Sequence, residues 1–205
     1  MTQCAVPAIK TSMIDTRSAL LTDLYQLTML EGYWRGQMVG EAAFECYVRS
    51  LPHGRSFLMA AGLEQVLNYL ETLRFQPEEL EWLAQSGRFS AEFLHWLREF
   101  RFRGDVFALP EGTLCFANEP LVRIVAPLPE AQFVESRLIN LLHFQTMIAS
   151  KAARCALAAP NRTLVDFGFR RAHGSEAGVY AARAAYLAGF AGTATVAATK
   201  SRNAD

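Results

Sequence analysis

The alternation of strand-like and helical patterns after residue 120 limits the possible folds of this chain more than any other feature. In order, the runs fall at 121–126 (strand-like), 130–159 (helical), 163–167 (strand-like), 176–188 (helical) and 193–198 (strand-like). Strands that alternate with helices in this way form a parallel sheet with right-handed crossovers. A closed (β/α)₈ barrel needs about 200 residues or more, whereas two crossover units fit here. The pattern therefore predicts an α/β fold, either as a small open sheet or as the front part of a larger barrel.

The chain before residue 121 mixes both patterns. Apolar residues at helical spacing predict four helices, which start near Thr22-Asp23, at Leu63, at Pro77 and after Ser90. The side chain of Thr22 or Asp23 could cap the first helix, and Gly36 suits its end. Alternating exposure predicts a half-buried strand over 41–49, and turn signals separate two further strands at 105–109 and 113–116.

Charge and composition exclude several classes of function. The 205 residues carry 20 Lys and Arg against 20 Asp and Glu, so no basic surplus points to nucleic acid. No apolar stretch approaches the ~18 residues of a membrane span, and the first dozen residues lack the apolar core of a signal peptide. The four cysteines lie far apart with no C-x-x-C pair, which argues against a zinc knuckle or a disulfide framework. We therefore expect a soluble, cytoplasmic chain with no nucleic-acid or membrane partner and reduced, buried thiols.

The run at 163–167 is the strongest candidate for a ligand site. It reads as a buried strand that breaks at Gly168 and is followed by Arg170 and Arg171. Ligands in α/β folds lie beyond the carboxyl ends of the strands, where this sequence places Phe167 and both arginines. An aromatic face beside a planar guanidinium suits a flat aromatic acid or a phosphate. A solvated arginine pair next to a strand would give the same pattern. Tyr25 lies off the main apolar stripe of its helix and is either a surface or interface residue or a ligand contact.

Seven segments, taken in order, resemble the nicotinate phosphoribosyltransferase family over residues 20–199. They are Leu21–Met29 (LTDLYQLTM), Leu109–Gly112 (LPEG), Asn118–Leu121 (NEPL), Asn140–Thr146 (NLLHFQT), Lys151–Arg154 (KAAR), Asp166–Ala172 (DFGFRRA) and Gly189–Val196 (GFAGTATV). Each segment alone is a weak signal, but their order and spacing are specific. The resemblance implies a type II phosphoribosyltransferase, in which a mixed α/β N-terminal domain precedes an irregular (β/α) barrel and two subunits form a dimer.

The resemblance also implies an activity and site residues. The family transfers the phosphoribosyl group of 5-phosphoribosyl 1-diphosphate (PRPP) to nicotinate, yields nicotinate mononucleotide for NAD salvage, and uses ATP and Mg²⁺. Carried over by motif, Tyr25 approaches nicotinate from the neighbouring subunit, while Phe167 and Arg170 hold its ring and carboxylate. Arg171 is a candidate for the phosphate side. The implied domains are an N-terminal tail (1–17), a mixed α/β domain (18–126), a partial β/α barrel (127–199) and a divergent tail (200–205).

The sequence departs from the family pattern after Thr199. Family members are much longer and carry a G-T-x-A-H-S segment whose histidine is phosphorylated by ATP, whereas Lys200–Asp205 stands here instead. None of the four histidines, His53, His95, His143 and His173, lies in a matching motif, so no catalytic residue and no metal ligand is assigned, and no motif present binds Mg²⁺ or ATP. We expect an N-terminal portion, produced by truncation, a frameshift or a split gene, that is inactive alone.

The partners expected from this interpretation are a second copy of the chain or a complementing C-terminal chain. Two alternatives stay open. The chain could be a non-catalytic remnant or dimer-interface module without the ATP-coupling and PRPP-binding half. It could also be a small self-sufficient α/β binding domain that shares only its ancestry with the family.

Overall fold

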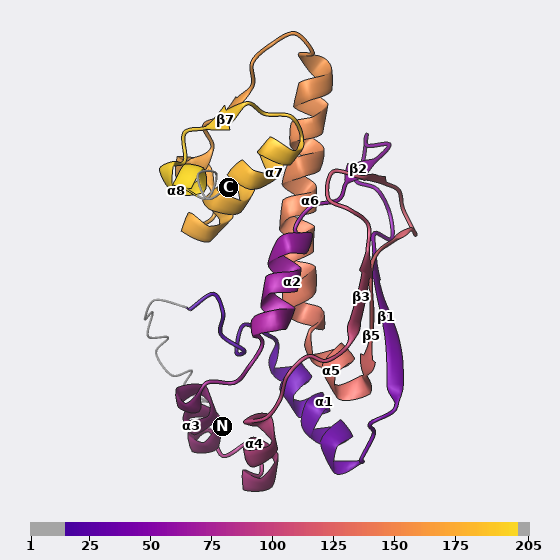
Figure 1. Cartoon of the computed structure of the whole chain (residues 1–205), viewed down its shortest axis with the longest axis vertical. Coiled ribbons are helices and arrows are strands. Elements are labelled where there is room, and N and C mark those ends of the chain that lie inside the picture. Colours follow the sequence, from indigo (N-terminus) through magenta and orange to yellow (C-terminus); the bar gives the residue numbers. More distant parts are fainter. Residues whose placement is uncertain (1–14, 201–205) are drawn as a thin grey trace, which may run out of the picture.

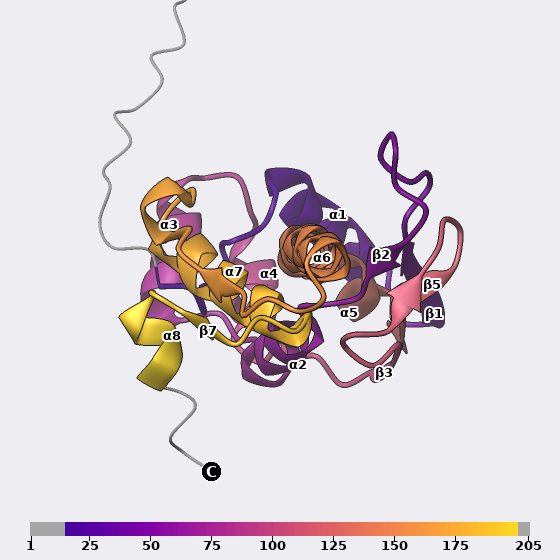
Figure 2. The same cartoon turned by 90° about the horizontal axis from the view of Figure 1, so that it is seen from above.

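The computed structural model describes residues 15–200, so most of the tails expected at 1–17 and 200–205 lies outside the described residues. The long helix α6 (Glu135–Ala158) forms the axis of the molecule, and α2 (Leu63–Thr72) and α7 (Ser175–Leu187) pack along it (Figure 1). Viewed along this axis, the strands β1 (Glu41–Tyr47), β3 (Asp105–Ala108) and β5 (Pro120–Pro127) lie on one side of α6, and α7 and α8 (Val196–Lys200) lie on the other (Figure 2). Within residues 15–200, no helix is long and apolar enough to cross a lipid bilayer.

The first sheet is antiparallel, with β5 (Pro120–Pro127) between β1 (Glu41–Tyr47) and β3 (Asp105–Ala108). Its register places Phe44 and Val106 on either side of Ile124, and these side chains point into the core. The alternation predicted for 41–49 is confirmed up to Tyr47, where a register shift at Cys46/Tyr47 ends the ladder. A two-stranded ladder of β2 (Leu58–Met59) and β4 (Leu114–Cys115) lies beside it.

The predicted helices of the N-terminal domain are present as α1 (Leu24–Arg35), α2, α3 (Pro77–Gln85) and α4 (Ala91–Leu97). Ser90 caps α4, because its Oγ accepts a hydrogen bond from the Phe93 amide at 3.4 Å. The capping expected of Asp23 is wrong. Its carboxylate accepts a hydrogen bond from Ser136 Oγ at 2.7 Å instead, and so ties α1 to α6.

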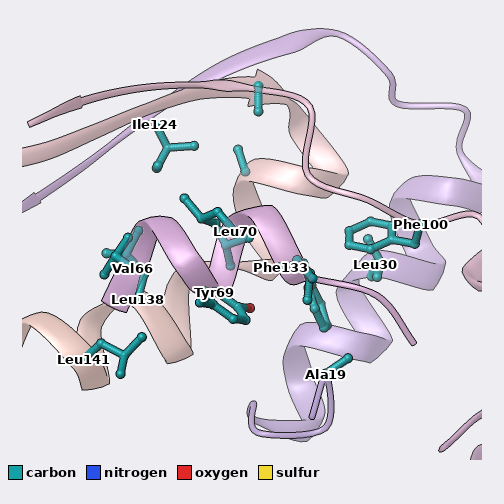
Figure 3. Packing of buried hydrophobic residues seen from close by; sticks show 14 of the residues in the cluster. Ala19, Leu30, Val66, Tyr69, Leu70, Phe100, Ile124, Phe133, Leu138 and Leu141 are labelled. Atoms are coloured by element: carbon teal, nitrogen blue, oxygen red, sulfur yellow. The ribbon is translucent and has the colours of Figure 1, made fainter. Parts of the chain in front are cut away.

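The main core lies where α2, α6 and the sheet meet, with α5 (Leu128–Phe133) beneath (Figure 3). The predicted single helix over 130–159 is interrupted at Val134, which ends α5 and precedes α6. Tertiary packing explains the break, because α5 is buried along most of its length against α1, β1 and β5, whereas α6 packs on α2 and α7. Such burial overrides the continuous helical propensity of the segment.

The C-terminal unit contains one parallel strand pair, β6 (Val165–Asp166) with β7 (Gly192–Thr193), joined through α7. The first predicted crossover is wrong, because β5 pairs with β1 and β3 and shares no sheet with β6. The strand predicted over 193–198 is also wrong after Thr193, where α8 (Val196–Lys200) begins. The alanines of this segment favour a helix once no neighbouring strand offers hydrogen bonds.

The strand β6 is less buried than its sequence suggested. Val165 is 44% exposed and Phe167 is 70% exposed. The reason is that β6 has one paired neighbour, β7, in the part of the chain that the structure describes. An apolar run in a parallel sheet is buried when helices and strands cover both its faces, and this pair lacks that cover.

Candidate functional site

The segment that follows β6 forms a tight turn that presents Phe167, Arg170 and Arg171. The chain leaves Asp166, turns at Gly168 and enters the short 3₁₀ helix η1 (Phe169–Arg171). The Arg171 amide donates to the Gly168 carbonyl at 2.8 Å, and the Ala172 amide donates to the Phe169 carbonyl at 3.0 Å. These backbone bonds hold the turn compact while its outer side chains stay exposed.

The two guanidinium groups of the turn differ from those of Arg137 and Arg183. Neither Arg170 nor Arg171 makes an ion pair with a residue in the range 15–200, and both are exposed. By contrast, Arg137 pairs with Glu176 at 3.0 Å and Arg183 pairs with Glu111 at 2.6 Å. The turn therefore combines an open phenyl ring with two uncompensated positive charges, a combination that suits a planar anion.

Tyr25 lies in the first turn of α1, against the start of α6. The same end of α6 also meets the start of α7, because Arg137 pairs with Glu176. The Tyr25 hydroxyl accepts a hydrogen bond from Gln26 Nε2 at 3.0 Å and lies 3.4 Å from Glu135 Oε2. The structure thus brings Phe167, Arg170 and Arg171 onto one turn, and in the described residues no hydrogen bond joins Tyr25 to them.

The hydrogen bonds around Tyr25 could not be found from the sequence. Gln26 is fully buried, donates to Glu135 Oε2 at 2.7 Å, and accepts from Gln132 Nε2 at 2.7 Å. This buried network joins α1 to the α5–α6 junction and holds the helix that carries Tyr25. The only signal in the sequence was the D-L-Y-Q segment itself, because the partners lie more than a hundred residues away.

A second cluster, of charged side chains, joins the start of α2 and the turn between β3 and β4 to α7. Glu111, in the turn between β3 and β4, accepts hydrogen bonds from the Gly62 and Leu63 amides at 2.6 and 3.0 Å, and so caps α2. Its two oxygens also pair with Arg183 of α7 at 2.9 and 2.6 Å. Burial would raise the pKa of Glu111, but the Arg183 guanidinium and the two amides outweigh it and lower the pKa below its ordinary value.

His173 directly follows the turn after β6, two residues after Arg171, whereas His143 and His95 line other parts of the surface. His143 lines a pocket of about 260 Å³ between β1 and α6, together with Cys46, Tyr47 and Thr146. His95 lines the groove between α3 and α4. In the described range, no three His, Cys, Asp or Glu side chains converge in a way that could hold a metal ion.

Comparisons with known proteins agree on the family. Residues 20–143 match the family model of the nicotinate phosphoribosyltransferase (NAPRTase) N-terminal domain. The nicotinate phosphoribosyltransferase pncB2 of Mycobacterium tuberculosis is 52% identical over 182 residues, which cover 89% of this chain and 39% of that protein. The Bacillus subtilis nicotinate phosphoribosyltransferase is 40% identical over 190 residues, which cover 92% of this chain and 39% of that protein.

The solved structures give the same result at the level of the fold. The crystal structure of human nicotinic acid phosphoribosyltransferase superposes with a TM-score of 0.80 and 37% identity, over 88% of this chain and 37% of that one. A nicotinate-nucleotide pyrophosphorylase from Pyrococcus furiosus shares the fold at a TM-score of 0.73 and 22% identity. The chain thus spans about two fifths of the length of the relatives that it matches. Its order of motifs, its fold and these similarities show that it belongs to the nicotinate phosphoribosyltransferase family.

Proposed function

We propose that the chain binds nicotinate at the turn after β6 and takes part in the transfer of the phosphoribosyl group of PRPP to nicotinate, a step of NAD salvage in the cytoplasm. The observation that carries the proposal is the exposed ring of Phe167 three residues before the unpaired guanidinium of Arg170. Phe167 stacks on the pyridine ring, and Arg170 binds its carboxylate through two parallel hydrogen bonds. Arg171 faces a phosphate of PRPP.

The chemistry needs no general base in this chain. The ring nitrogen of nicotinate is already a free nucleophile, and positive charge develops at the anomeric carbon of the sugar as diphosphate leaves. Catalysis then consists of holding the nitrogen against that carbon and stabilising the departing anion. Mg²⁺ would neutralise the diphosphate and ATP would drive the equilibrium. We assign no residue to Mg²⁺, because the described residues bring no metal-binding group together, and none to ATP.

We further propose an assembly of two chains, as the family resemblance implies. Within the described residues no hydrogen bond or ion pair joins Tyr25 to the turn after β6; its hydroxyl bonds to Gln26 and Glu135 instead. In a homodimer, α1 of one subunit would supply Tyr25 to the turn of the other. A complementing C-terminal chain would supply the remaining barrel strands beside β6 and β7.

Replacing Arg170 by alanine tests the proposal. We expect the affinity for nicotinate to fall by about tenfold to a hundredfold, because hydrogen bonds to a charged group contribute about 1.5–3 kcal/mol. The affinity for nicotinamide, which lacks the carboxylate, should change little. Isothermal titration of both ligands gives the ratio directly.

The matched control is Arg162→Ala. Arg162 is exposed and precedes β6, at the opposite end of the strand from the turn. Its removal changes the net charge equally and should leave both affinities unchanged. A preference for nicotinate that survives in Arg170→Ala would remove Arg170 from the carboxylate role, and a wild-type chain that fails to bind nicotinate would contradict the proposed function.

A further inference from the structure

The carboxylate of Asp166 joins the C-terminal ends of β6 and β7. Its Oδ1 accepts a hydrogen bond from the Gly168 amide at 3.0 Å, and its Oδ2 accepts one from Thr193 Oγ1 at 2.8 Å. Its backbone carbonyl accepts from the Ala194 amide at 2.8 Å. Both side-chain oxygens of Asp166 are therefore engaged with the backbone or side chain of the two strand ends.

The bond from the Gly168 amide closes a turn around Phe167. An aspartate that accepts from the amide two residues later forms an Asx-turn, which restricts the backbone of the residue between them. That residue is Phe167, so the carboxylate of Asp166 determines the direction in which the phenyl ring leaves the strand. The ring itself is exposed and has no aromatic neighbour among the ring pairs of the described residues.

Thr193 holds the carboxylate in place. Its hydroxyl donates to Asp166 and accepts a hydrogen bond from the Thr195 amide at 3.0 Å, so both of its capacities are used. Thr195 is itself buried at the start of the segment that leads into α8. Because the hydroxyl both donates and accepts a hydrogen bond, its orientation is fixed, and this in turn restricts the orientation of the Asp166 carboxylate.

The far side of the turn has its own anchor. A Cβ atom added at Gly178 of α7 would lie 2.5 Å from Cδ2 of Phe169, so the ring of Phe169 fills the space that the glycine leaves. The η1 segment packs on α7 through this contact. With Asp166 at the start and Phe169 at the far side, the turn is held at both ends while Phe167 and Arg170 project from it.

We propose that Asp166 and Thr193 are positioning residues for the binding of nicotinate, an inference that rests on the proposed function of the turn. Asp166 bonds to the backbone of the turn and Thr193 bonds to Asp166, and together they set the relative placement of the Phe167 ring and the Arg170 guanidinium. Recognition of a flat aromatic acid needs both groups at once, because stacking fixes the ring plane and the guanidinium must then meet the carboxylate within that plane.

The variant that isolates this role is Thr193→Val, which keeps the shape of the side chain and removes the hydroxyl. The Asp166 carboxylate and the Thr195 amide each lose a partner. We expect hydrogen exchange of the Gly168 amide, followed by NMR, to accelerate by about five- to tenfold, because one such bond contributes about 1 kcal/mol. The preference for nicotinate over nicotinamide should fall by a similar factor, with the melting temperature nearly unchanged.

Three further variants complete the test. Thr163→Val makes the same chemical change at an exposed threonine before β6, whose side chain has no hydrogen bond to the described residues. It should alter neither the exchange rate of the Gly168 amide nor the preference for nicotinate. Asp166→Asn keeps an oxygen that can accept from Gly168 and should retain more of the ligand preference than Asp166→Ala. A general structural role would change the melting temperature and the affinities for both ligands together.

The outcomes separate the two proposals. If the wild-type chain binds nicotinate but Thr193→Val keeps the wild-type ligand preference or the wild-type exchange rate at Gly168, the positioning role is overturned. If the wild-type chain does not bind nicotinate, the proposed function of the turn fails first, and the positioning role falls with it.

Discussion

Replacing Glu111 by alanine is expected to lower the free energy of unfolding by about 3 kcal/mol, one of the two largest effects in this chain. The change leaves the Arg183 guanidinium without its main partner in a half-buried position, and breaking such a pair costs about 3–5 kcal/mol when it is fully buried. It also removes the acceptor for the first amides of α2, which contributes about 1 kcal/mol. Because the pair is partly exposed, the expected total loss is smaller than the sum of these two contributions. Urea denaturation at neutral pH measures the loss.

The control for this experiment is Glu64→Ala. Glu64 also pairs with Arg183, but its side chain is 67% exposed, so its removal should cost less than about 1 kcal/mol. Both variants keep Arg183, and they differ in whether the buried or the exposed carboxylate partner is removed. Equal losses for the two variants would show that the buried geometry of Glu111 contributes nothing beyond an ordinary surface ion pair.

The effect of Glu111 should also depend on pH. Its pKa is lowered in the folded chain from an ordinary value of 4.5. A carboxyl group whose pKa is depressed by folding stabilises the fold fully above its unfolded pKa, and it loses that contribution as the pH falls through the folded value. The difference in stability between the wild-type chain and Glu111→Ala should therefore be largest at neutral pH and shrink below pH 4.5. A difference that grows in acid would contradict the assigned direction.

Replacing Phe133 by alanine is expected to cost about 3–5 kcal/mol, as for other buried aromatic residues. Phe133 is fully buried at the end of α5, and its ring centroid lies 5.4 Å from that of Phe75 and 5.3 Å from that of Phe100. The ring thus links α5 to the segments that flank α3 and α4, and no small adjustment of one element can fill the cavity. The melting temperature and the urea midpoint should both fall sharply.

Phe107→Ala is the matched control for this prediction. Phe107 lies in β3 on the outer face of the antiparallel sheet, where its side chain is 59% exposed. The same truncation there removes little buried area and should cost less than about 1 kcal/mol. A loss for Phe133→Ala as small as that for Phe107→Ala would mean that the aromatic cluster is not the packing centre that the structure indicates.

The candidate site was predictable only in part. The order of residues in Asp166–Ala172 pointed to a turn after a strand with an aromatic ring and two arginines, and the structure contains such a turn. The link between Asp166 and Thr193 was not predictable, because it joins two strand ends 27 residues apart. The open position of Phe167 was also missed, since the burial of an apolar run depends on what packs over it.

The sequence by itself determined the local elements and the family. Amphipathic spacing and capping residues depend on neighbours within a few positions, which is why α1, α2, α3, α4 and β1 were found close to their observed bounds. Only the tertiary structure decided that β5 pairs with β1 and β3, that the long helix breaks at Val134, and that Glu111 meets Arg183. Each of these depends on contacts between segments far apart in the chain, where the hydrogen bonds and the buried area gained outweigh local preference.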